Sequence, residues 1–385
     1  MLKSRLCIAF FAFAVGCAPA QKPLTDYVNP MLGTATLWDS VDLGFKPTKR
    51  TWGAEVFPGS SLPNAMVQVS PVTKFHSGAG YQYEDSVIYG FTHTNKGHWN
   101  LCHIPLLPVT GTPTPGDYCS PFSHERESAA PGYYQVFLDR YGVDAQLSST
   151  LRCAFHKYTY PAGAAASLLA DLQRSNEHVR AWDIRKEGDN VFAGWQQTGE
   201  KMYFYAVANR PVTGIEPVVE GDREVRIVRF GEGDGALELR IGFSFVSEKN
   251  ARENLEAEML GKSFAEVRSE ATATWNDLLG RIRVEGGTER EKGLFYSSLY
   301  RSFLWPALRS DVNGEFTDVD GKVINPGFRY YTGPSYWDDY RNKLILLGML
   351  APDVAADVIS SDTDRGEKRG GFMPTFFHGD HASAF

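Results

Sequence analysis

The sequence predicts a multidomain protein, β then α, in which helices follow an N-terminal antiparallel β-sandwich. As far as Val246, short apolar runs are bounded by Gly, Pro, Asn and Asp, which is typical of short strands joined by turns. From Ser247 onward, apolar residues instead recur at helical spacing. A chain of 385 residues is long for one core, and strands that precede helices along a chain indicate two domains.

The strands of the first domain are clearest in five apolar runs: residues 65–69, 133–138, 191–195, 202–207 and 237–243. Many short strands with frequent turn signals predict an antiparallel sandwich. The Gly-rich segment 231–235 is interpreted as a hairpin turn between two of these strands.

Helices are predicted in four later segments: residues 249–279, 290–306, 337–350 and 353–359. The first of them lacks Pro and is rich in Ala, Glu, Leu and Arg, so it is expected to form a helical linker. We therefore expect a signal segment at 1–20, an N-terminal β-sandwich domain at 21–246, a helical linker at 247–285 and a helical domain at 286–385.

The first twenty residues have the organisation of an export signal. Lys3 and Arg5 precede an apolar run of about ten residues, and the small residues 16–20 follow it. A membrane-spanning helix needs about twenty apolar residues, so the segment is predicted to be removed rather than to span a membrane. Cleavage after Ala20 fits the A-x-A pattern, whereas residues 14–17 resemble a bacterial lipobox with Cys17 as the lipidated residue. We favour the lipobox.

Composition limits the classes of function. Apolar residues make up 43% and charged residues 22% of the chain, as in globular proteins. Aromatic residues make up 13%, which suits a protein that stacks rings against sugars, although a β-rich core would also use them. The net charge of −7 without any basic run argues against a nucleic-acid partner.

Cysteine chemistry and nucleotide chemistry are both poor candidates. Of five cysteines, two lie in the signal segment, and Cys102, Cys119 and Cys153 remain, with neither a CxxC pair nor a Cys–His spacing for zinc. One disulfide among these three is possible. The sequence also lacks a P-loop, a GxGxxG motif and a GxSxG elbow.

Four stretches are rich in functional residue types: residues 51–59, 91–100, 336–341 and 370–381. Each combines aromatic rings with charged or amide groups, and a sugar site needs that combination because rings cover the apolar face and polar groups hold the hydroxyls. Trp52 and Glu55 in the first stretch either line a site or only order a turn. His98 and Trp99 in the second either contribute to a site or pack on the sandwich.

The last two stretches also allow two interpretations. Asp338 and Arg341 have the spacing of a helix-surface ion pair, but their place beside Trp337 at a helix start favours a cleft. Asp380 and His381 belong to a short His/Asp group that would need another ligand from elsewhere to complete a metal site.

Motifs in a defined order along nearly the whole chain resemble one enzyme family. They are residues 27–34, 57–59, 66–71, 78–83, 88–94, 122–125, 131–134, 275–276, 295–300, 337–341 and 379–382. In these motifs the chain resembles the N-terminal portion of glycoside hydrolase family 92, the exo-acting α-mannosidases. The resemblance implies a β-sandwich, a helical linker and the start of an incomplete six-hairpin α/α barrel, with the active site where sandwich and barrel meet.

The resemblance also implies a calcium-dependent, inverting hydrolysis. Such a reaction needs a carboxylic acid and a carboxylate base about 6.5–9.5 Å apart. By resemblance, both lie beyond Phe385, and most calcium ligands do so too. As it stands, the chain is therefore expected to lack the full catalytic apparatus.

The substrate-holding residues can be carried over to this sequence. By resemblance, Trp337, Asp338 and Arg341 line the subsite for the terminal mannose, Asp380 and His381 lie at its mouth, and His98 and Trp99 reach in from the sandwich. The loop 96–102 and the insertion 37–49 depart from the commoner members of the family. The α-1,2 linkage is therefore only a default.

The function predicted from these observations is an exo-α-mannosidase that trims mannose from N-glycans or mannans. It would be exported to the periplasm or attached to the bacterial envelope, where Cys17 would provide its only link to a membrane. The alternatives are a non-catalytic carbohydrate-binding protein and a different sugar hydrolase or phosphorylase with the same architecture.

Overall fold

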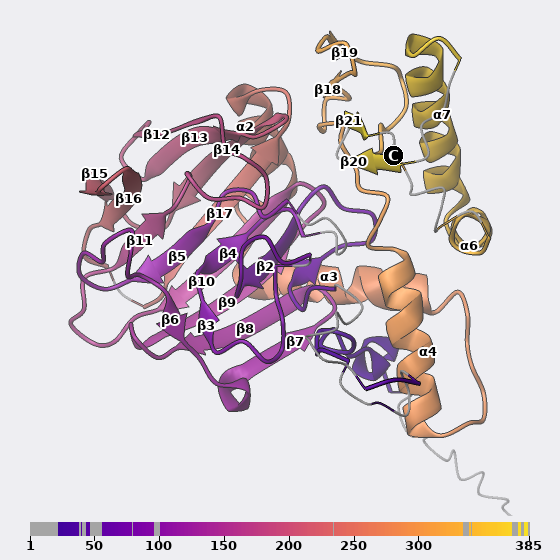
Figure 1. The fold of residues 1–385 in the computed structure, drawn as a ribbon, viewed down its shortest axis with the longest axis horizontal. Helices are drawn as coiled ribbons and strands as arrows, with labels where there is room; N and C mark the ends of the chain where they lie inside the picture. The colour runs from indigo at the N-terminus through magenta and orange to yellow at the C-terminus, as the bar shows by residue number, and fades with distance from the viewer. Residues whose placement is uncertain are drawn as a thin grey trace, which may run out of the picture.

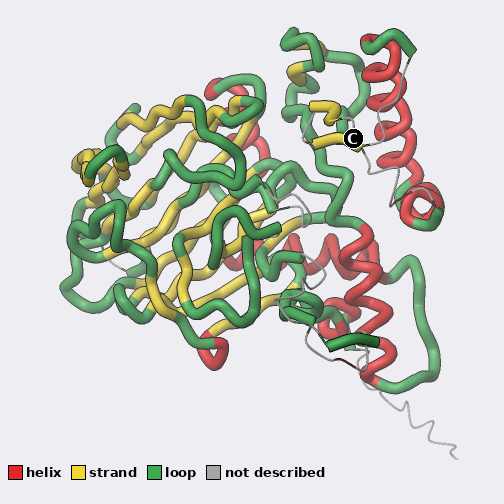
Figure 2. The backbone as a smooth tube through the Cα atoms, in the orientation of Figure 1, coloured by secondary structure: helices red, strands yellow, loops and turns green. Residues whose placement is uncertain are grey.

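In the computed structural model of the protein, the described residues are 22–37, 40, 44–46, 56–78, 80–95, 101–233, 235–333, 339, 341–371, 376–378 and 381–383. The signal segment with Cys17, together with Trp52 and Glu55, lies outside them. The strands of the two large sheets fill one part of the molecule, and the helices Glu289–Ser302, Lys343–Leu350 and Pro352–Lys368 lie at its other side (Figures 1 and 2).

Two open antiparallel sheets form the first part, which confirms the predicted sandwich. The seven-stranded sheet has the spatial order β1 (Ser60–Ser61), β2 (Gln68–Val72), β4 (Gly90–Thr92), β5 (Leu106–Val109), β11 (Ser167–Ala170), β16 (Arg223–Phe230) and β15 (Val212–Glu220). The eight-stranded sheet has the order β12 (Ala181–Lys186), β13 (Val191–Gln197), β14 (Lys201–Ala208), β17 (Leu237–Ser244), β10 (Cys153–Thr159), β9 (Val143–Ser149), β8 (Tyr133–Leu138) and β7 (Glu127–Ala130).

The remaining elements are shorter pairs and the helices. Three two-stranded pairs are β3 (Val87–Ile88) with β6 (Ser120–Pro121), β18 (Phe316–Thr317) with β19 (Val323–Ile324), and β20 (Phe376–His378) with β21 (His381–Ser383). The helical elements are η1 (Leu24–Tyr27), η2 (His124–Arg126), α2 (Glu248–Glu258), α3 (Phe264–Leu279), α4 (Glu289–Ser302), α6 (Lys343–Leu350) and α7 (Pro352–Lys368). None of the described helices is long and apolar enough to cross a membrane.

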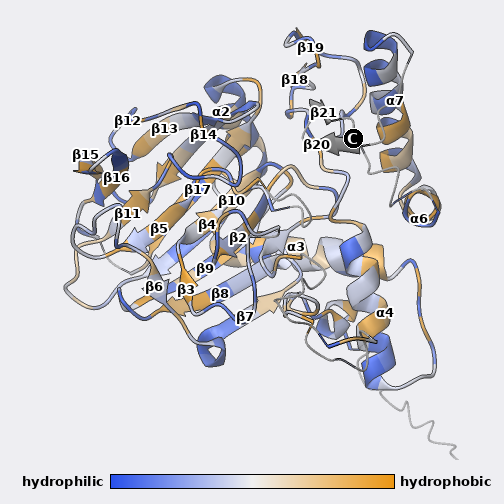
Figure 3. Cartoon of the chain, in the orientation of Figure 1, coloured by the Kyte–Doolittle hydropathy of each residue, from blue (hydrophilic) through white to orange (hydrophobic). Residues whose placement is uncertain are grey.

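The core of the sandwich follows from the alternation of apolar residues along the strands. In β14, Met202, Phe204 and Ala206 are buried and the residues between them are half-buried, as the two-residue period of a strand requires. Side chains of both sheets meet in one cluster, where the rings of Phe91 and Tyr158 stack at 6.3 Å. Hydrophobic residues concentrate on the strands, whereas α2 is mainly hydrophilic (Figure 3).

Helices α2 and α3 cover the outer face of the eight-stranded sheet. A second apolar cluster forms there, in which Phe155 of the sheet packs with Leu255 and Phe264 of the two helices. Gly242 permits this approach, because a Cβ atom at that position would lie 2.1 Å from the carbonyl oxygen of Ala251. The sheet is therefore buried on both faces where the helices cross it.

The predicted helix 249–279 is two helices in the structure. Gly261 between them has φ +89°, a left-handed conformation that ends α2 without strain. Ser263 then begins α3 with a capping box that includes Glu266. The helix predicted at 290–306 is α4, which ends at Ser302.

Helix α7 continues well past the predicted end at Ile359. Its second half is polar and lacks the apolar period that marks a helix in a sequence. Tertiary contacts stabilise this half: the buried Arg365 pairs with Asp362 and donates to the carbonyl oxygen of Tyr331 at 2.6 Å. Lys368 pairs with Asp318 at 3.0 Å.

Three smaller predictions differ from the structure. The strand expected at 65–69 is β2, which begins at Gln68. Segment 231–235 is not a hairpin turn, because it joins β16 in one sheet to β17 in the other. Cys102, Cys119 and Cys153 form no disulfide with one another, so the disulfide that the sequence allowed is absent among these described residues.

A buried tryptophan joins α3 and α4 to the sandwich. Trp275 donates from Nε1 to the carbonyl oxygen of Ser61 at 2.7 Å, and its ring lies 4.3 Å from that of Tyr300. The next residue, Asn276, bonds through its side chain to both the backbone and the hydroxyl of Thr25, each at 3.1 Å. One turn of α3 thus holds the N-terminal segment, the first strand and the next helix.

The chain that follows α4 is joined to the sandwich by one buried carboxylate. Asp311 accepts hydrogen bonds from the hydroxyl of Ser244 at 2.6 Å and from the amides of Asn250 and Asn254 at 2.9 and 2.7 Å. Burial raises the pKa of Asp311 to about 6, while these hydrogen bonds oppose the rise. Beside it, Arg152 donates to the carbonyl oxygen of Ser310 at 2.8 Å.

Two neutral histidines, His93 and His156, form a chain of hydrogen bonds in the core. His93 donates from Nδ1 to the carbonyl oxygen of Ile104 at 3.0 Å, since a carbonyl can only accept. Burial lowers the pKa of His93 to about 3, so its Nε2 is unprotonated and accepts from Nε2 of His156 at 3.0 Å. Nδ1 of His156 then accepts from the hydroxyl of Tyr158 at 2.6 Å. Every proton in this chain has a defined position.

We predict that Asp311→Asn lowers the free energy of unfolding by about 1–3 kcal/mol at pH 4.5, because the amide brings two N–H donors to a place where Ser244, Asn250 and Asn254 already donate. The folded pKa of Asp311 exceeds its ordinary value of 3.8, so the stability it contributes is fully present below about pH 4 and is lost as pH rises through 6. The difference between wild type and variant should therefore shrink from pH 4.5 to pH 7 in urea unfolding. Asp320→Asn, at an exposed position in the same segment, is the matched control. An equally small loss in both variants would contradict the prediction.

We predict that the buried histidines make the protein less stable in acid. The folded pKa of His93 and of His156 lies below the ordinary value, so the unfolded chain takes up protons below pH 6.5 that the folded chain does not. Each such histidine removes about 1.4 kcal/mol per pH unit between pH 6.5 and pH 5. His156→Leu should reduce this slope, so that its unfolding free energy approaches that of wild type as pH falls. Parallel curves in urea unfolding at pH 5–7 would refute this.

Candidate functional site

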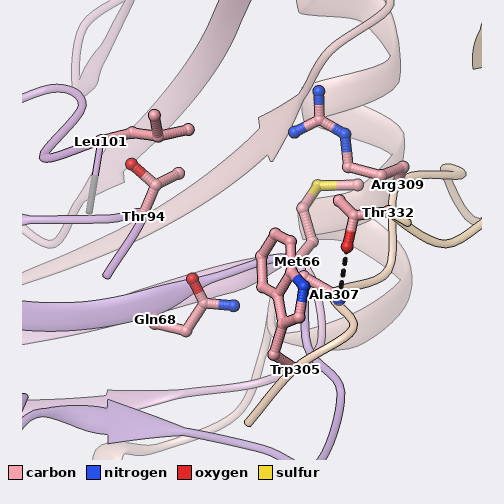
Figure 4. Close-up of a pocket in the computed structure, with 8 residues that line it drawn as sticks. All are labelled: Met66, Gln68, Thr94, Leu101, Trp305, Ala307, Arg309 and Thr332. Carbon is pink, nitrogen blue, oxygen red and sulfur yellow. Dashed lines mark hydrogen bonds between the residues drawn. The ribbon is translucent and has the colours of Figure 1, made fainter. Parts of the chain in front are cut away.

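A pocket lies between the sandwich and the chain that follows α4. Its cavity volume is about 20 Å³, room for about one water molecule, and it is lined by Met66, Gln68, Thr94, Leu101, Trp305, Ala307, Arg309 and Thr332 (Figure 4). Four of these residues belong to the sandwich and four to the later segment. The lining combines an indole ring with amide, hydroxyl and guanidinium groups, the combination that a sugar site requires.

The sandwich side of the pocket is held by amide hydrogen bonds. The side chain of Gln68 accepts from the backbone N–H of Asn95 at 3.2 Å, and the side chain of Asn95 donates to the carbonyl oxygen of Gln68 at 2.7 Å. Asn95 is also held by Thr92, whose hydroxyl donates to its side-chain oxygen at 3.0 Å. These bonds fix the backbone around Thr94 against strand β2.

The opposite wall is held by Asn64. Its backbone N–H donates to the carbonyl oxygen of Phe303 at 2.6 Å, and its side chain donates to that of Pro306 at 2.8 Å. Asn64 has φ +53°, a left-handed conformation that Asn tolerates better than most residues. On the same wall, Thr332 accepts from the N–H of Ala307 at 2.9 Å.

Arg309 provides the positive charge in the lining. Its guanidinium lies 3.3 Å from the centre of the Phe245 ring and pairs with Glu200. The side chain is only 4% exposed, and its charge is compensated within the wall. Arg309 therefore adds little net charge to the pocket.

A neutral histidine lies behind Thr94. Nδ1 of His103 lies 3.1 Å from the hydroxyl of Thr94, and its Nε2 lies 3.0 Å from the hydroxyl of Thr198. Burial lowers the pKa of His103 to about 4, and nearby Arg309 adds to the effect. Glu177 opposes this shift, but His103 is still uncharged at neutral pH.

The structure describes few of the site residues that the sequence predicts. Trp337, Asp338, Asp380, His98 and Trp99 lie outside the described residues, so their roles stay predictions. Arg341 is exposed in the turn that precedes α6. His381 begins β21 and pairs with His378, while its side chain is not described.

The described neighbours of the predicted residues do meet at the pocket. Thr94 and Leu101 flank the segment 96–100, and both line it. Thr332 also lines it, and the carbonyl oxygen of Gly333 accepts from Nε1 of Trp305 at 3.2 Å, directly before the segment 334–338. The segments that contain His98 and Trp337 are therefore attached to the rim of one pocket.

The sequence did not predict the lining residues themselves. Gln68 and Thr94 belong to motifs of the family resemblance, yet neither was assigned to the site. Trp305 and Arg309 combine a ring with a cation, as the predicted stretches do, but they are separated by apolar residues. Among the described residues, no group of three or more His, Cys, Asp or Glu side chains could hold a metal ion.

Solved structures of GH92 α-mannosidases superimpose on this chain. An α-mannosidase of family GH92 from Bacteroides thetaiotaomicron superimposes with a TM-score of 0.83 at 25% identity, over 94% of this chain and 51% of its own. Its complex with mannoimidazole matches with the same TM-score at 26% identity, over 93% and 50% of the two chains. An inverting GH92 mannosidase from Bacteroides thetaiotaomicron VPI-5482 matches with a TM-score of 0.79 at 25% identity, over 92% and 50%.

Sequence comparison gives the same result. An uncharacterized secreted glycosidase of Arthroderma benhamiae is 24% identical, over 75% of this chain and 42% of its own. The chain thus spans about half the length of the relatives it matches. Residues 27–253 match the glycosyl hydrolase family 92 N-terminal domain, and residues 250–384 match the family's catalytic domain. The chain therefore belongs to glycosyl hydrolase family 92.

Proposed function

We propose that the protein is an exo-acting α-mannosidase that removes terminal mannose from N-glycans or mannans. The observation that carries this proposal is the pocket between the sandwich and the chain after α4, in a fold that matches GH92 α-mannosidases. A related enzyme was solved in complex with mannoimidazole, which supports mannose as the sugar.

The described lining would bind the sugar as a neutral polyol. The ring of Trp305 would cover an apolar face of mannose beside the polar groups of Gln68, Thr94 and Arg309. An uncharged sugar needs such groups without a net field, and Glu200 compensates the charge of Arg309.

The residues carried over from the family would complete the subsite. We assign Trp337, Asp338 and Arg341 to the terminal mannose, Asp380 and His381 to the mouth, and His98 and Trp99 to the sandwich side. The attachment of segments 96–100 and 334–338 to the pocket rim supports this assignment.

The reaction we propose is an inverting hydrolysis. A carboxylic acid protonates the glycosidic oxygen while a carboxylate removes a proton from water, which attacks the anomeric carbon from the opposite face. The products are free mannose of inverted configuration and a shortened glycan. We place both carboxyl groups beyond Phe385, so the residues up to that point would bind the sugar without hydrolysing it.

Calcium dependence, the α-1,2 linkage and the location are further parts of the proposal. Calcium would bind mannose hydroxyls and favour a distorted ring, and we assign it no ligand among the described residues. Lipidation at Cys17 would hold the enzyme at the bacterial envelope, where glycans that cannot enter the cell are accessible.

We predict that the full-length protein releases mannose from 4-nitrophenyl α-mannoside and that mannoimidazole inhibits the reaction. A chelator should abolish turnover, and added calcium should restore it. A chain that ends at Phe385 should be inactive. No turnover of any α-mannoside by the full-length protein would refute the proposal, and normal turnover by the chain ending at Phe385 would refute the placement of the acid and base.

We predict that Asp338→Ala in the full-length protein lowers kcat/KM for that substrate by at least about a hundredfold, since a buried charged hydrogen bond to the sugar would be lost. The exposed Asp320→Ala is the matched control and should keep wild-type activity. Thermal unfolding of both variants should match that of wild type. An unchanged kcat/KM in Asp338→Ala would show that Asp338 only orders the turn before α6.

A further inference from the structure

An open groove lies at the edge of the sandwich formed by β12, β15 and β16, away from α4 and α7 (Figure 1). It runs between the loop 171–180, which precedes β12, and the turn that joins β15 to β16. The space within it is about 600 Å³, within the range of known ligand sites. The pocket described above has no lining residue in common with it.

An indole ring forms one wall of the groove. Trp182 lies on β12, the edge strand of the eight-stranded sheet, and remains half-buried. Arg226, from β16 of the other sheet, packs its guanidinium 5.3 Å from the ring centre. Trp182 also packs against the main apolar core, so its ring is held in a fixed orientation where it lines the groove.

Two arginines of the lining are fixed from behind by a buried carboxylate. Arg223 pairs with Asp171 at 2.7 Å, and Arg174 lies 3.8 Å from the same oxygen. The guanidinium of Arg174 also lies 5.2 Å from the ring centres of Phe75 and Tyr89. These contacts make that side of the groove rigid.

The polar rim carries little net charge. Arg180 is exposed there, and the carboxylates of Glu177 and Asp222 line the same groove. With Asp171 behind Arg174 and Arg223, three carboxylates balance three guanidinium groups. Such a lining favours a neutral ligand with many hydroxyls over an anion such as a phosphate ester.

We propose that this groove is a second carbohydrate-binding site, which holds a neutral oligosaccharide chain by stacking on Trp182 and by hydrogen bonds to Arg180, Glu177 and Asp222. Rings stack on sugars because the C–H groups of a pyranose form an apolar face, and charged planar groups bind paired hydroxyls. The choice of mannan as the ligand rests on the proposed function, whereas the groove itself does not.

The groove is linked to the pocket through one shared wall. The carbonyl oxygen of Leu101, which lines the pocket, accepts from the hydroxyl of Ser175 at 2.6 Å and from the N–H of Asn176 at 3.0 Å. Ser175 lines the groove. A polymer held in the groove would keep its other branches at high local concentration near the pocket.

Affinity electrophoresis of the full-length protein in gels that contain soluble yeast mannan tests this site. Saturating mannoimidazole in the gel blocks the pocket, so that any remaining retardation reports the groove. We expect wild type to be retarded, and Trp182→Ala and Arg180→Ala to bind mannan at least about fivefold more weakly. Arg180 is exposed, so its replacement carries little risk to folding. Arg290→Ala, an exposed position at the start of α4, should bind like wild type.

Turnover distinguishes this site from the pocket. Trp182→Ala and Arg180→Ala should keep the wild-type kcat/KM for 4-nitrophenyl α-mannoside. This substrate is too small to extend from the pocket to the groove. Wild-type retardation in both variants, or no retardation of wild type, would overturn the second site. Retardation by a phosphorylated mannan alone would overturn the neutral ligand. Failure to hydrolyse the small mannoside would refute the proposed function. Retardation in the gel would still test the groove, because it measures binding and does not require hydrolysis.

Discussion

The position of Asp311 is the constraint on which the functional part of this structure depends. Its carboxylate binds Ser244 at the end of the sandwich and Asn250 and Asn254 of α2, three donors that face one buried acceptor pair. Ser310 and Arg309 are the two residues next to Asp311 on the side of the pocket. Their backbone cannot move without breaking the hydrogen bonds of Asp311. Burying a carboxylate costs desolvation free energy, and the three hydrogen bonds offset part of that cost, since the pKa of Asp311 stays raised at about 6.

The geometry of the pocket depends on these hydrogen bonds of Asp311, which join the sandwich to the chain after α4. Half of its lining belongs to the sandwich and half to the segment between Trp305 and Thr332, so neither part forms the site alone. Asn64 holds the second part against the sandwich by donating hydrogen bonds to the carbonyl oxygens of Phe303 and Pro306. The same arrangement explains why the lining could not be derived from sequence: Gln68 and Thr332 meet only because hydrogen bonds between distant residues bring them together.

The features of the fold that the sequence predicts are those that depend on local patterns. The alternation in 133–138 and 237–243 gives strands whose ends differ little from β8 and β17, and their order before the helices gives the architecture. The break at Gly261 was missed because the apolar period continues across it. The end of α7 was missed because Arg365 stabilises it through Tyr331, a contact that no local pattern encodes. The sugar-binding residues were predicted from family motifs. Their described neighbours Thr94, Leu101 and Thr332 line the pocket, whereas most of the predicted residues lie outside the described part of the chain.

Hydrogen bonds fix both described ends of segment 96–100. Gln68 and Asn95 hold the backbone before this segment, and Ser175 with Asn176 holds Leu101 after it. Thr94 and Leu101, at these two ends, line the pocket. The four residues that hold the ends lie outside residues 96–100, so these anchors do not depend on the identity of the residues between them. The family resemblance predicts that loop 96–102 departs from the commoner members, and anchors formed by residues outside the segment are compatible with such a departure.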